Sequence, residues 1–247
     1  MWKLIKYELR KQMQSKAIIF GIVALLEIVW FWGLFMNENL LISTSGFLFV
    51  AANISMLYLY FESIVTFSND LKTKNSYMLF MTPNSSYKII GAKVLASGIQ
   101  IIVYGLCFFG IGVLDLGIMA IRIHSVAEII ELIKTFLREA VQIDVNVTYV
   151  LISILSLLIV GIFILVLAYL SITLSATFLA NKAYKGIISF AIFVLILFVV
   201  EKIASAVLGN ILLSDGTTII LSILWYAAMS IAAYVATAWM LEKRVSL

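Results

Sequence analysis

Long apolar runs separated by short polar stretches dominate the chain, and this pattern predicts its elements. A helix rises about 1.5 Å per residue, so about 20 apolar residues cross the hydrocarbon core of a bilayer. The spans predicted on this basis are 17–36, 46–67, 94–114, 148–179, 186–200 and 219–241. The pattern therefore indicates an all-α membrane protein, with six transmembrane helices forming a single domain over residues 1–247.

Residues 1–16 precede the first span and have their own periodicity. Trp2, Ile5, Leu9 and Met13 recur at helical spacing, and the basic side chains fall largely on other faces. This pattern predicts a helix that lies in the membrane interface, with its lysines near anionic headgroups. A basic flank that only sets topology is the alternative.

Two of the apolar runs have unusual ends. The run 148–179 exceeds the length that a span requires, so the helix tilts or continues beyond the bilayer. The fifth run is interrupted by Glu201 and Lys202, and turn signals follow. Residues 201–218 are read as a re-entrant helical hairpin, with a plain extracellular loop as the alternative.

The segment 115–147 is the longest stretch without a span. Ser125 and Glu128 have the spacing of a capping box, which starts a helix, and an apolar stripe follows them. We expect an amphipathic helix here, resting on lipid or over the mouth of the bundle. His124, beside the cap, is expected at the surface.

The segment 68–93 is the most polar stretch, with four lysines against Asp70 and with the only proline of the chain. A short helix over 69–81 is predicted, with Ser68 or Asn69 as its cap and Thr82-Pro83 as its end. Ser85 or Ser86 is expected to cap the helix that follows.

Composition agrees with a lipid environment. The chain is 64% hydrophobic and 12% charged, whereas soluble domains carry about 25% charged residues. No phosphate-binding G-x-x-x-x-G-K-[ST] motif occurs, and we expect no room for a nucleotide-binding domain beside the spans. The N-terminus does not resemble a signal peptide. Cys107 is alone, which excludes an internal disulfide, and is expected to pack in the core.

The distribution of charge predicts the topology. Basic residues gather before the first span and after the second, fourth and sixth, while the other loops carry most of the acids. The positive-inside rule then places the basic loops and both termini in the cytoplasm. The basic pI of about 9.1 is explained in the same way, without nucleic-acid binding.

Two carboxylates fall inside predicted spans. Glu27, near the middle of the first, is costly there. It is read either as a substrate or cation contact or as a protonated side chain bonded to a neighbouring helix. Glu62, near the cytoplasmic end of the second, is expected to approach the headgroups or to pair with Lys72 or Lys74.

Three pieces of sequence, LIKYELRKQMQSK, DLKTKNSYMLFMTPNSSYKIIGAKVL and WMLEKRVSL, occur in an order and spacing that resemble the ABC-2 type permeases. These are the transmembrane subunits of ATP-driven ABC exporters, and the resemblance covers the whole length. It implies an N-terminal elbow helix, a cytoplasmic coupling helix and a short basic tail. The coupling helix contacts the ATPase, through the matching residues Asp70, Leu71, Lys72, Lys74, Tyr77, Met78, Phe80 and Met81.

The resemblance also implies partners and a location. A separate ABC ATPase chain would bind ATP and Mg²⁺, so that this chain has no cofactor and is not itself an enzyme. A second permease chain, identical or related, would complete the pathway in a bacterial plasma membrane. The size and the lack of a large extracellular domain are similar to permeases for peptide-toxin export and antimicrobial-peptide self-protection, whereas the long acidic outer loop after the third span departs from the family.

The walls of the pathway are expected to be apolar and aromatic, which suits amphipathic substrates such as peptides. The candidate pathway residues are Glu27, Trp30, Phe31, Tyr58 and Glu62. Two other functions compete with export. One is a lipid-modifying membrane enzyme, which needs polar residues clustered at one depth, and the other is a channel or sensor that works without an ATPase.

Overall fold

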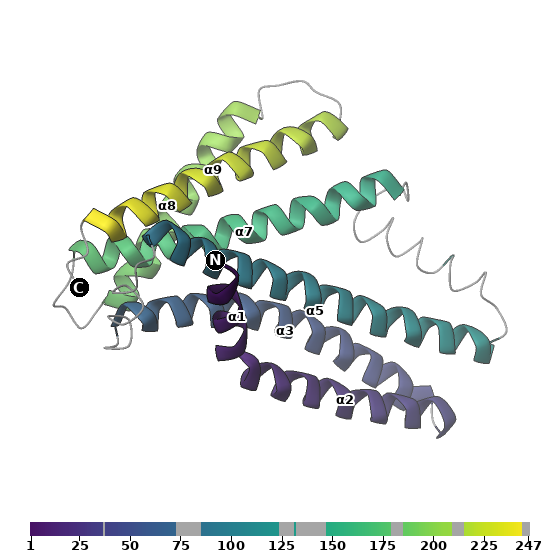
Figure 1. Cartoon of the computed structure of the whole chain (residues 1–247). Helices are drawn as coiled ribbons and strands as arrows, with labels where there is room; N and C mark the ends of the chain where they lie inside the picture. The colour runs from purple at the N-terminus through teal and green to yellow at the C-terminus, as the bar shows by residue number, and fades with distance from the viewer. Residues whose placement is uncertain are drawn as a thin grey trace. The chain divides into compact units, whose positions relative to one another are not determined.

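The structure is a computed structural model, and it describes residues 1–36, 38–72, 85–123, 131, 147–178, 185–208 and 215–243. The described residues are almost wholly helical (Figure 1). The helices are α1 (Trp2–Lys11), α2 (Met13–Met36), α3 (Glu38–Lys72), α5 (Ser86–Ile123), α7 (Val147–Phe178), α8 (Lys185–Leu208) and α9 (Asp215–Lys243).

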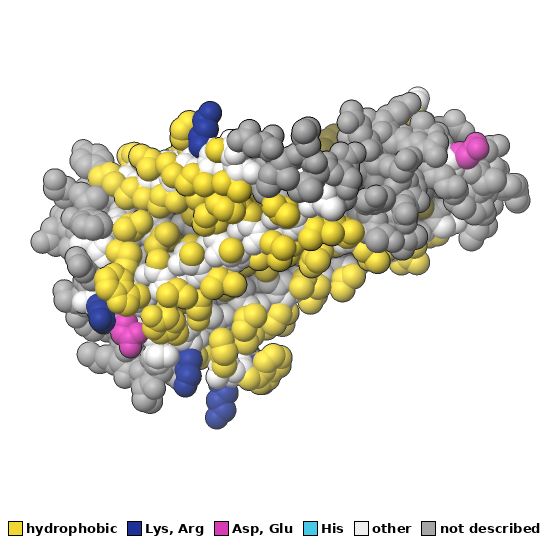
Figure 2. All heavy atoms as spheres, turned by 90° about the horizontal axis from the view of Figure 1, so that it is seen from above, with side chains coloured by type: hydrophobic (Ala, Val, Ile, Leu, Met, Phe, Trp, Pro, Cys, Tyr) yellow, Lys and Arg dark blue, Asp and Glu magenta, His cyan; other side chains and the backbone are white. Residues whose placement is uncertain are grey.

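Within the described ranges, six helices are long and apolar enough to cross a membrane: α2, α3, α5, α7, α8 and α9. Large apolar side chains such as Phe35, Phe109 and Leu157 are exposed on them. Hydrophobic side chains cover most of the coloured surface in Figure 2, and the few Lys and Arg side chains lie near its edges. Because water would penalise so much exposed apolar surface, the fold is that of a multi-pass membrane protein.

The chain divides into two compact units. The first comprises Met1–Leu4, Ser63–Leu95 and Val145–Leu247, and the second comprises Ile5–Glu62 and Ala96–Asp144. The long helices α3 and α5 contribute residues to both units. Each unit is therefore described by itself.

In the first unit, α7 packs along α9 and α8 (Figure 1). Phe163, Leu167 and Val200 form the core between α7 and α8. Small side chains are buried on both α7 and α9, including Ser171, Ser175, Ala233, Thr237 and Ala238. Small residues allow helix backbones to approach closely in a membrane, where dispersion contacts replace the hydrophobic effect.

In the second unit, α2 and α3 form a tight antiparallel pair around Trp30, Leu34 and Leu41. The two helices approach so closely that a Cβ added to Gly33 would lie 2.9 Å from the Leu41 backbone nitrogen. Helix α5 joins the pair through Ile118 and Met119 and through a ring contact of Phe20 with Tyr104 at 4.9 Å.

Hydroxyl groups inside the spans bond to their own helices. Thr44, Thr173 and Thr237 each donate to the carbonyl of the residue four positions earlier, at 2.6 to 2.8 Å. A hydroxyl in lipid has no water to bond, so the nearby carbonyl satisfies it. These threonines therefore need no hydrogen-bond partner from another helix.

Helix α3 differs from the predicted second span at both ends. It begins at Glu38, before the predicted start at Gly46, and runs to Lys72. Ser68 and Asn69, predicted to cap a new helix, lie inside this continuous helix. The physical reason is that no proline or glycine interrupts residues 61–72, and propensity alone does not force a break where polar residues begin.

Helix α5 also exceeds its predicted span of 94–114. It begins directly after Ser85, whose carbonyl accepts bonds from the Lys88 and Ile89 amides at 2.9 and 3.3 Å. It then continues past Asp115, which was predicted to open the outer loop, to Ile123. Cys107 on this helix is exposed rather than packed in a core.

The predicted interruption at Glu201 and Lys202 does not end α8, which continues to Leu208. Both charges have local partners. Glu201 accepts a bond from the Tyr226 hydroxyl at 2.9 Å, and the Lys202 ammonium lies 5.6 Å from the Phe198 ring centre. The described residues of 201–218 belong to the end of α8 and the start of α9, and residues 209–214 lie outside the described residues.

The other predictions agree with the helices or lie beyond what is described. Helix α7 covers Val147–Phe178, close to the predicted 148–179 and longer than a bilayer requires. Helix α1 is strongly amphipathic and ends at Lys11. Gln12 alone separates it from α2, which begins at Met13. The predicted amphipathic helix after Ser125 lies outside the described residues, apart from Glu131, which is helical.

Candidate coupling site

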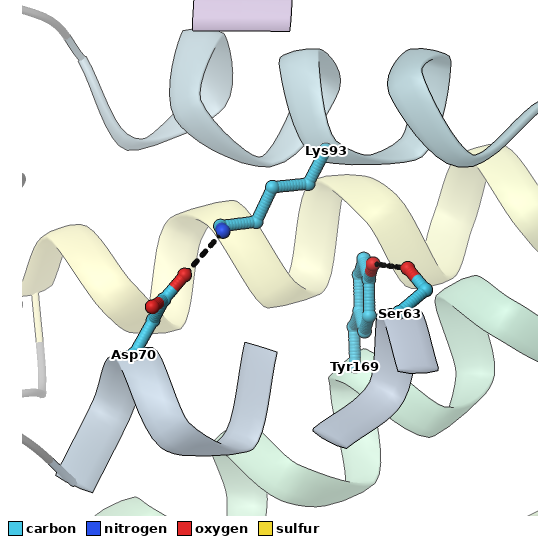
Figure 3. A network of polar contacts seen from close by, with 4 residues as sticks. All are labelled: Ser63, Asp70, Lys93 and Tyr169. Atoms are coloured by element: carbon cyan, nitrogen blue, oxygen red, sulfur yellow. Dashed lines mark hydrogen bonds and ion pairs between the residues drawn. The ribbon is translucent and has the colours of Figure 1, made fainter. Parts of the chain in front are cut away.

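The end of α3 and the start of α5 flank the basic segment that the sequence singled out. Asp70, in the last turn of α3, forms an ion pair with Lys93 in the third turn of α5 (Figure 3). The Lys93 side chain is 4% exposed and that of Asp70 is 13% exposed. The pair joins the two helices on either side of residues 73–84.

Helix α3 is tied to α7 next to this pair. The Ser63 and Tyr169 hydroxyls are hydrogen-bonded at 2.5 Å (Figure 3), and both side chains are buried. The Phe67 ring stacks on Tyr169 at 4.2 Å between centroids and an interplanar angle of 29°. Ser63, Phe67 and Asp70 follow helical spacing, so one face of α3 makes all of these contacts.

The start of α5 is tied to α9. The Tyr234 hydroxyl donates to the Tyr87 carbonyl at 2.7 Å, and the two rings meet edge-on at 6.3 Å. Gly91 faces the same tyrosine, because a Cβ added to it would lie 3.1 Å from the Tyr234 hydroxyl. The carbonyls of a first helical turn accept bonds from amides four residues later, so the Tyr234 hydroxyl adds a second bond to the Tyr87 oxygen, which has two lone pairs.

These contacts place the flanks of the basic segment in one compact unit with α7, α8 and α9. A displacement of the α3 end or the α5 start therefore acts directly on helices that pack against one another. The arrangement suits transmission of a mechanical push, since close-packed interiors are stiff and have low compressibility.

Of the eight predicted coupling residues, Asp70 and Leu71 are described with their side chains. Asp70 is engaged within the chain, and Leu71 is half-buried. Lys72 ends α3, and only its backbone is described. The remaining five, Lys74, Tyr77, Met78, Phe80 and Met81, lie outside the described residues.

Among the predicted pathway residues, Glu27 has an acidic neighbour. Its carboxyl group lies in electrostatic range of the Asp115 carboxyl group on α5, and Glu27 Oε1 has no hydrogen-bond partner among the described residues. Two ionised carboxylates repel each other at such range. The acidic neighbour of Glu27 is thus a residue that the sequence assigned to the outer loop.

The other predicted pathway residues differ in exposure. Trp30 is buried, and its indole N–H donates to Ser45 Oγ at 3.1 Å. Phe31 and Tyr58 are exposed. Trp30 is thus part of the α2–α3 core.

Glu62 contacts the start of α2 rather than the end of its own helix. Its Oε1 accepts a hydrogen bond from the Ser15 hydroxyl, and the Lys16 ammonium interacts with the same carboxylate. The predicted partners Lys72 and Lys74 have no described side chains. Glu62 therefore joins α3 to α2.

Sequence reasoning missed Tyr169 and Ser63, and it did not pair Asp70 with Lys93. Tyr169 stands in an almost unbroken apolar run, and a polar tip in such a run usually needs a buried partner. That signal identifies Tyr169 as a residue with a bond to make, but spacing within one helix does not reveal the partner on another.

The described residues contain no group of three or more His, Cys, Asp or Glu side chains arranged to hold a metal ion. Comparisons with protein-family models, curated proteins and solved structures gave no match to this chain.

Proposed function

We propose that the chain is the membrane-spanning permease subunit of an ATP-driven exporter of the ABC-2 type. In this proposal the basic segment after α3 faces the cytoplasm and docks on a separate ATPase chain, which binds ATP and Mg²⁺. Two permease chains, identical or related, form the pathway in a bacterial plasma membrane. The cargo is amphipathic, with peptide toxins or antimicrobial peptides as its most suitable class.

The observation that carries the proposal is the Asp70–Lys93 ion pair. It closes the base of the segment that contains Lys72, Lys74 and Lys88, so that the segment leaves and re-enters the bundle at one clamped point. A loop that only connects two spans needs no buried ion pair at its base, because loop closure itself costs little. A segment that receives a push needs a stiff attachment.

The contacts beyond the clamp support the same proposal. Tyr169 connects the α3 flank to α7, and Tyr234 connects the α5 flank to α9. Movement of the segment would thus reach α7 and α9, which pack together along their lengths. In the proposal, ATP binding closes the ATPases and this route carries the motion into the transmembrane helices.

The experiment is co-purification of the full chain with the ATPase encoded beside it, followed by ATP turnover in lipid nanodiscs. Charge reversal in the segment, with Lys72→Glu and Lys74→Glu together, is expected to abolish the complex. The matched control reverses two charges, Lys134→Glu and Arg138→Glu, in the segment 115–147, which is predicted to lie on the opposite side of the membrane. This control should leave the complex intact.

Turnover that rises with an amphipathic peptide would support export. A complex that tolerates the segment reversal would remove the coupling assignment. Absence of any ATPase partner would favour a channel, a sensor or a lipid-modifying enzyme instead.

A further inference from the structure

A second cluster of polar side chains lies in the other unit, around Glu62. It comprises Ser15 and Lys16 of α2, Glu62 of α3, and Gln100 and Tyr104 of α5. These residues belong to Ile5–Glu62 and Ala96–Asp144, so the cluster is internal to one compact unit.

Helices α3 and α5 meet near Glu62. A Cβ added to Gly105 of α5 would lie 3.2 Å from Met56 Cε of α3. Tyr104, next to Gly105, is in electrostatic range of Glu62. Gln100 lies one turn from Tyr104 on the same face of α5.

The cluster is closed to solvent but has unused hydrogen-bonding groups. Gln100 is 5% exposed and Tyr104 is 4% exposed. Among the described residues, Glu62 Oε2, Gln100 Nε2 and the Tyr104 hydroxyl have no hydrogen-bond partner. A buried polar group without a partner costs about 1–3 kcal/mol, so three together strongly favour the entry of a guest that bonds to them.

The charges of the cluster are already matched. The Lys16 ammonium interacts with the Glu62 carboxylate and donates to Gln12 Oε1 at 3.1 Å. A charged guest would leave one charge uncompensated in a site away from water, which is unfavourable. The guest that fits is therefore neutral.

The unused groups also define the hydrogen bonds of the guest. Glu62 Oε2 accepts, Gln100 Nε2 donates, and the Tyr104 hydroxyl does either. A guest must then both donate and accept at one point, which a secondary amide does through its N–H and C=O. The walls around it are apolar and aromatic, since Phe20 packs on Tyr104.

We infer that Glu62, Gln100 and Tyr104 form an occluded binding site for a neutral amide group of an amphipathic molecule. The inference rests on the proposed function for the source of that amide, a transported peptide. The site itself needs no ATPase. In the structure it is closed, so the amide enters when α2, α3 and α5 separate locally.

The test uses the full chain in phosphatidylcholine nanodiscs and N-octylacetamide as the probe. Binding is measured as the rise of the thermal unfolding midpoint with probe concentration, because a ligand that binds only the folded state stabilises it. Octyl methyl ether, which has the same alkyl tail and accepts but does not donate, is the control probe. We expect a saturable rise with the amide and none with the ether.

The variant Gln100→Leu/Tyr104→Phe is expected to weaken the amide effect at least about tenfold, since two hydrogen bonds are lost. Tyr226→Phe, which removes a phenol hydroxyl bonded to Glu201 on other helices, is the matched control and should behave as the wild type. If the double variant does not fold, Gln100→Met alone replaces it.

Equal effects of amide and ether, or an unchanged amide effect in the variant, would overturn the inference. A wild-type chain that ignores the amide would also overturn it and would assign the unused groups to internal water. If the chain forms a complex with an ATPase but binds no amide, only this inference is overturned. If it binds the amide but forms no complex with any ATPase, the exporter proposal is overturned and the binding site stands.

Discussion

Asp70 and Lys93 form a buried ion pair that joins the last turn of α3 to the third turn of α5. The two residues are separated by the whole basic segment, yet their helices leave and return at this one point (Figure 3). Because desolvated charges depend on each other, the pair fixes the register of the two helices more than it adds net stability.

Asp70→Asn and Lys93→Met are each expected to destabilise the protein by about 3 kcal/mol, because each leaves one buried charge without its partner. The double variant should be less destabilised than the two single changes added together. Unfolding in denaturant, in detergent micelles, measures this coupling. If the destabilisations of the two single variants simply add in the double variant, the ion pair contributes no coupling energy to stability.

The Ser63–Tyr169 bond should behave differently, because both groups are neutral and buried. Ser63→Ala leaves the Tyr169 hydroxyl without this partner and should cost about 1–3 kcal/mol. Tyr169→Phe keeps the stacking on Phe67 and should cost about 1 kcal/mol.

The double variant Ser63→Ala/Tyr169→Phe should be less destabilised than the two single changes added together, since either change alone already removes the bond. The thermal unfolding midpoints of the four proteins test this order. A Ser63→Ala protein as stable as the wild type would contradict it.

Gly33 and Gly21 lie on the same helix but in opposite environments. A Cβ at Gly33 would lie 2.9 Å from the Leu41 backbone, whereas a Cβ at Gly21 would meet nothing within 4 Å. Gly33→Ala is expected to destabilise by about 1–3 kcal/mol through overpacking. Gly21→Ala should stabilise by about 0.5–1 kcal/mol, because alanine loses less backbone entropy in a helix.

Comparison of the two unfolding free energies gives each variant its matched control. Similar effects of both substitutions would mean that α2 and α3 are not in close contact at Gly33.

The nearness of the Glu27 and Asp115 carboxyl groups predicts a protonated carboxyl group within the second unit, because two ionised carboxylates at close range repel each other. The C=O stretch of a protonated carboxyl should appear in the infrared spectrum at neutral pH and disappear in Glu27→Gln/Asp115→Asn. Glu201→Gln, at an exposed carboxylate bonded to Tyr226, is the control and should leave the band in place. A wild-type spectrum without the band would show that neither group is protonated.

Much of the fold follows from local sequence, because lipid forces each span to satisfy its own backbone. The span 148–179 agrees with α7, and the helical periodicity of residues 1–16 agrees with α1 over Trp2–Lys11. Helix ends were less predictable. Polar residues at Asp115 and Glu201 were expected to end helices, but each is accommodated in one.

The candidate sites show the same limit. Asp70 was identified from the sequence, and so were Glu27 and Glu62, because a charge near or in a membrane segment stands out. Their partners were not identified. Lys93, Ser15 and Asp115 lie 23, 47 and 88 residues along the chain from Asp70, Glu62 and Glu27. Periodicity within one helix carries no information on which helix faces it.

The sequence by itself determined that the described part of the chain has six helices long and apolar enough to cross a membrane, since apolar length decides that locally. Only the tertiary structure decided that Asp70 meets Lys93, that Ser63 meets Tyr169 and that Tyr104 lies in range of Glu62. The physical reason is that insertion into lipid depends on each segment alone, whereas the pairing of buried polar groups depends on how the packed helices are rotated and aligned.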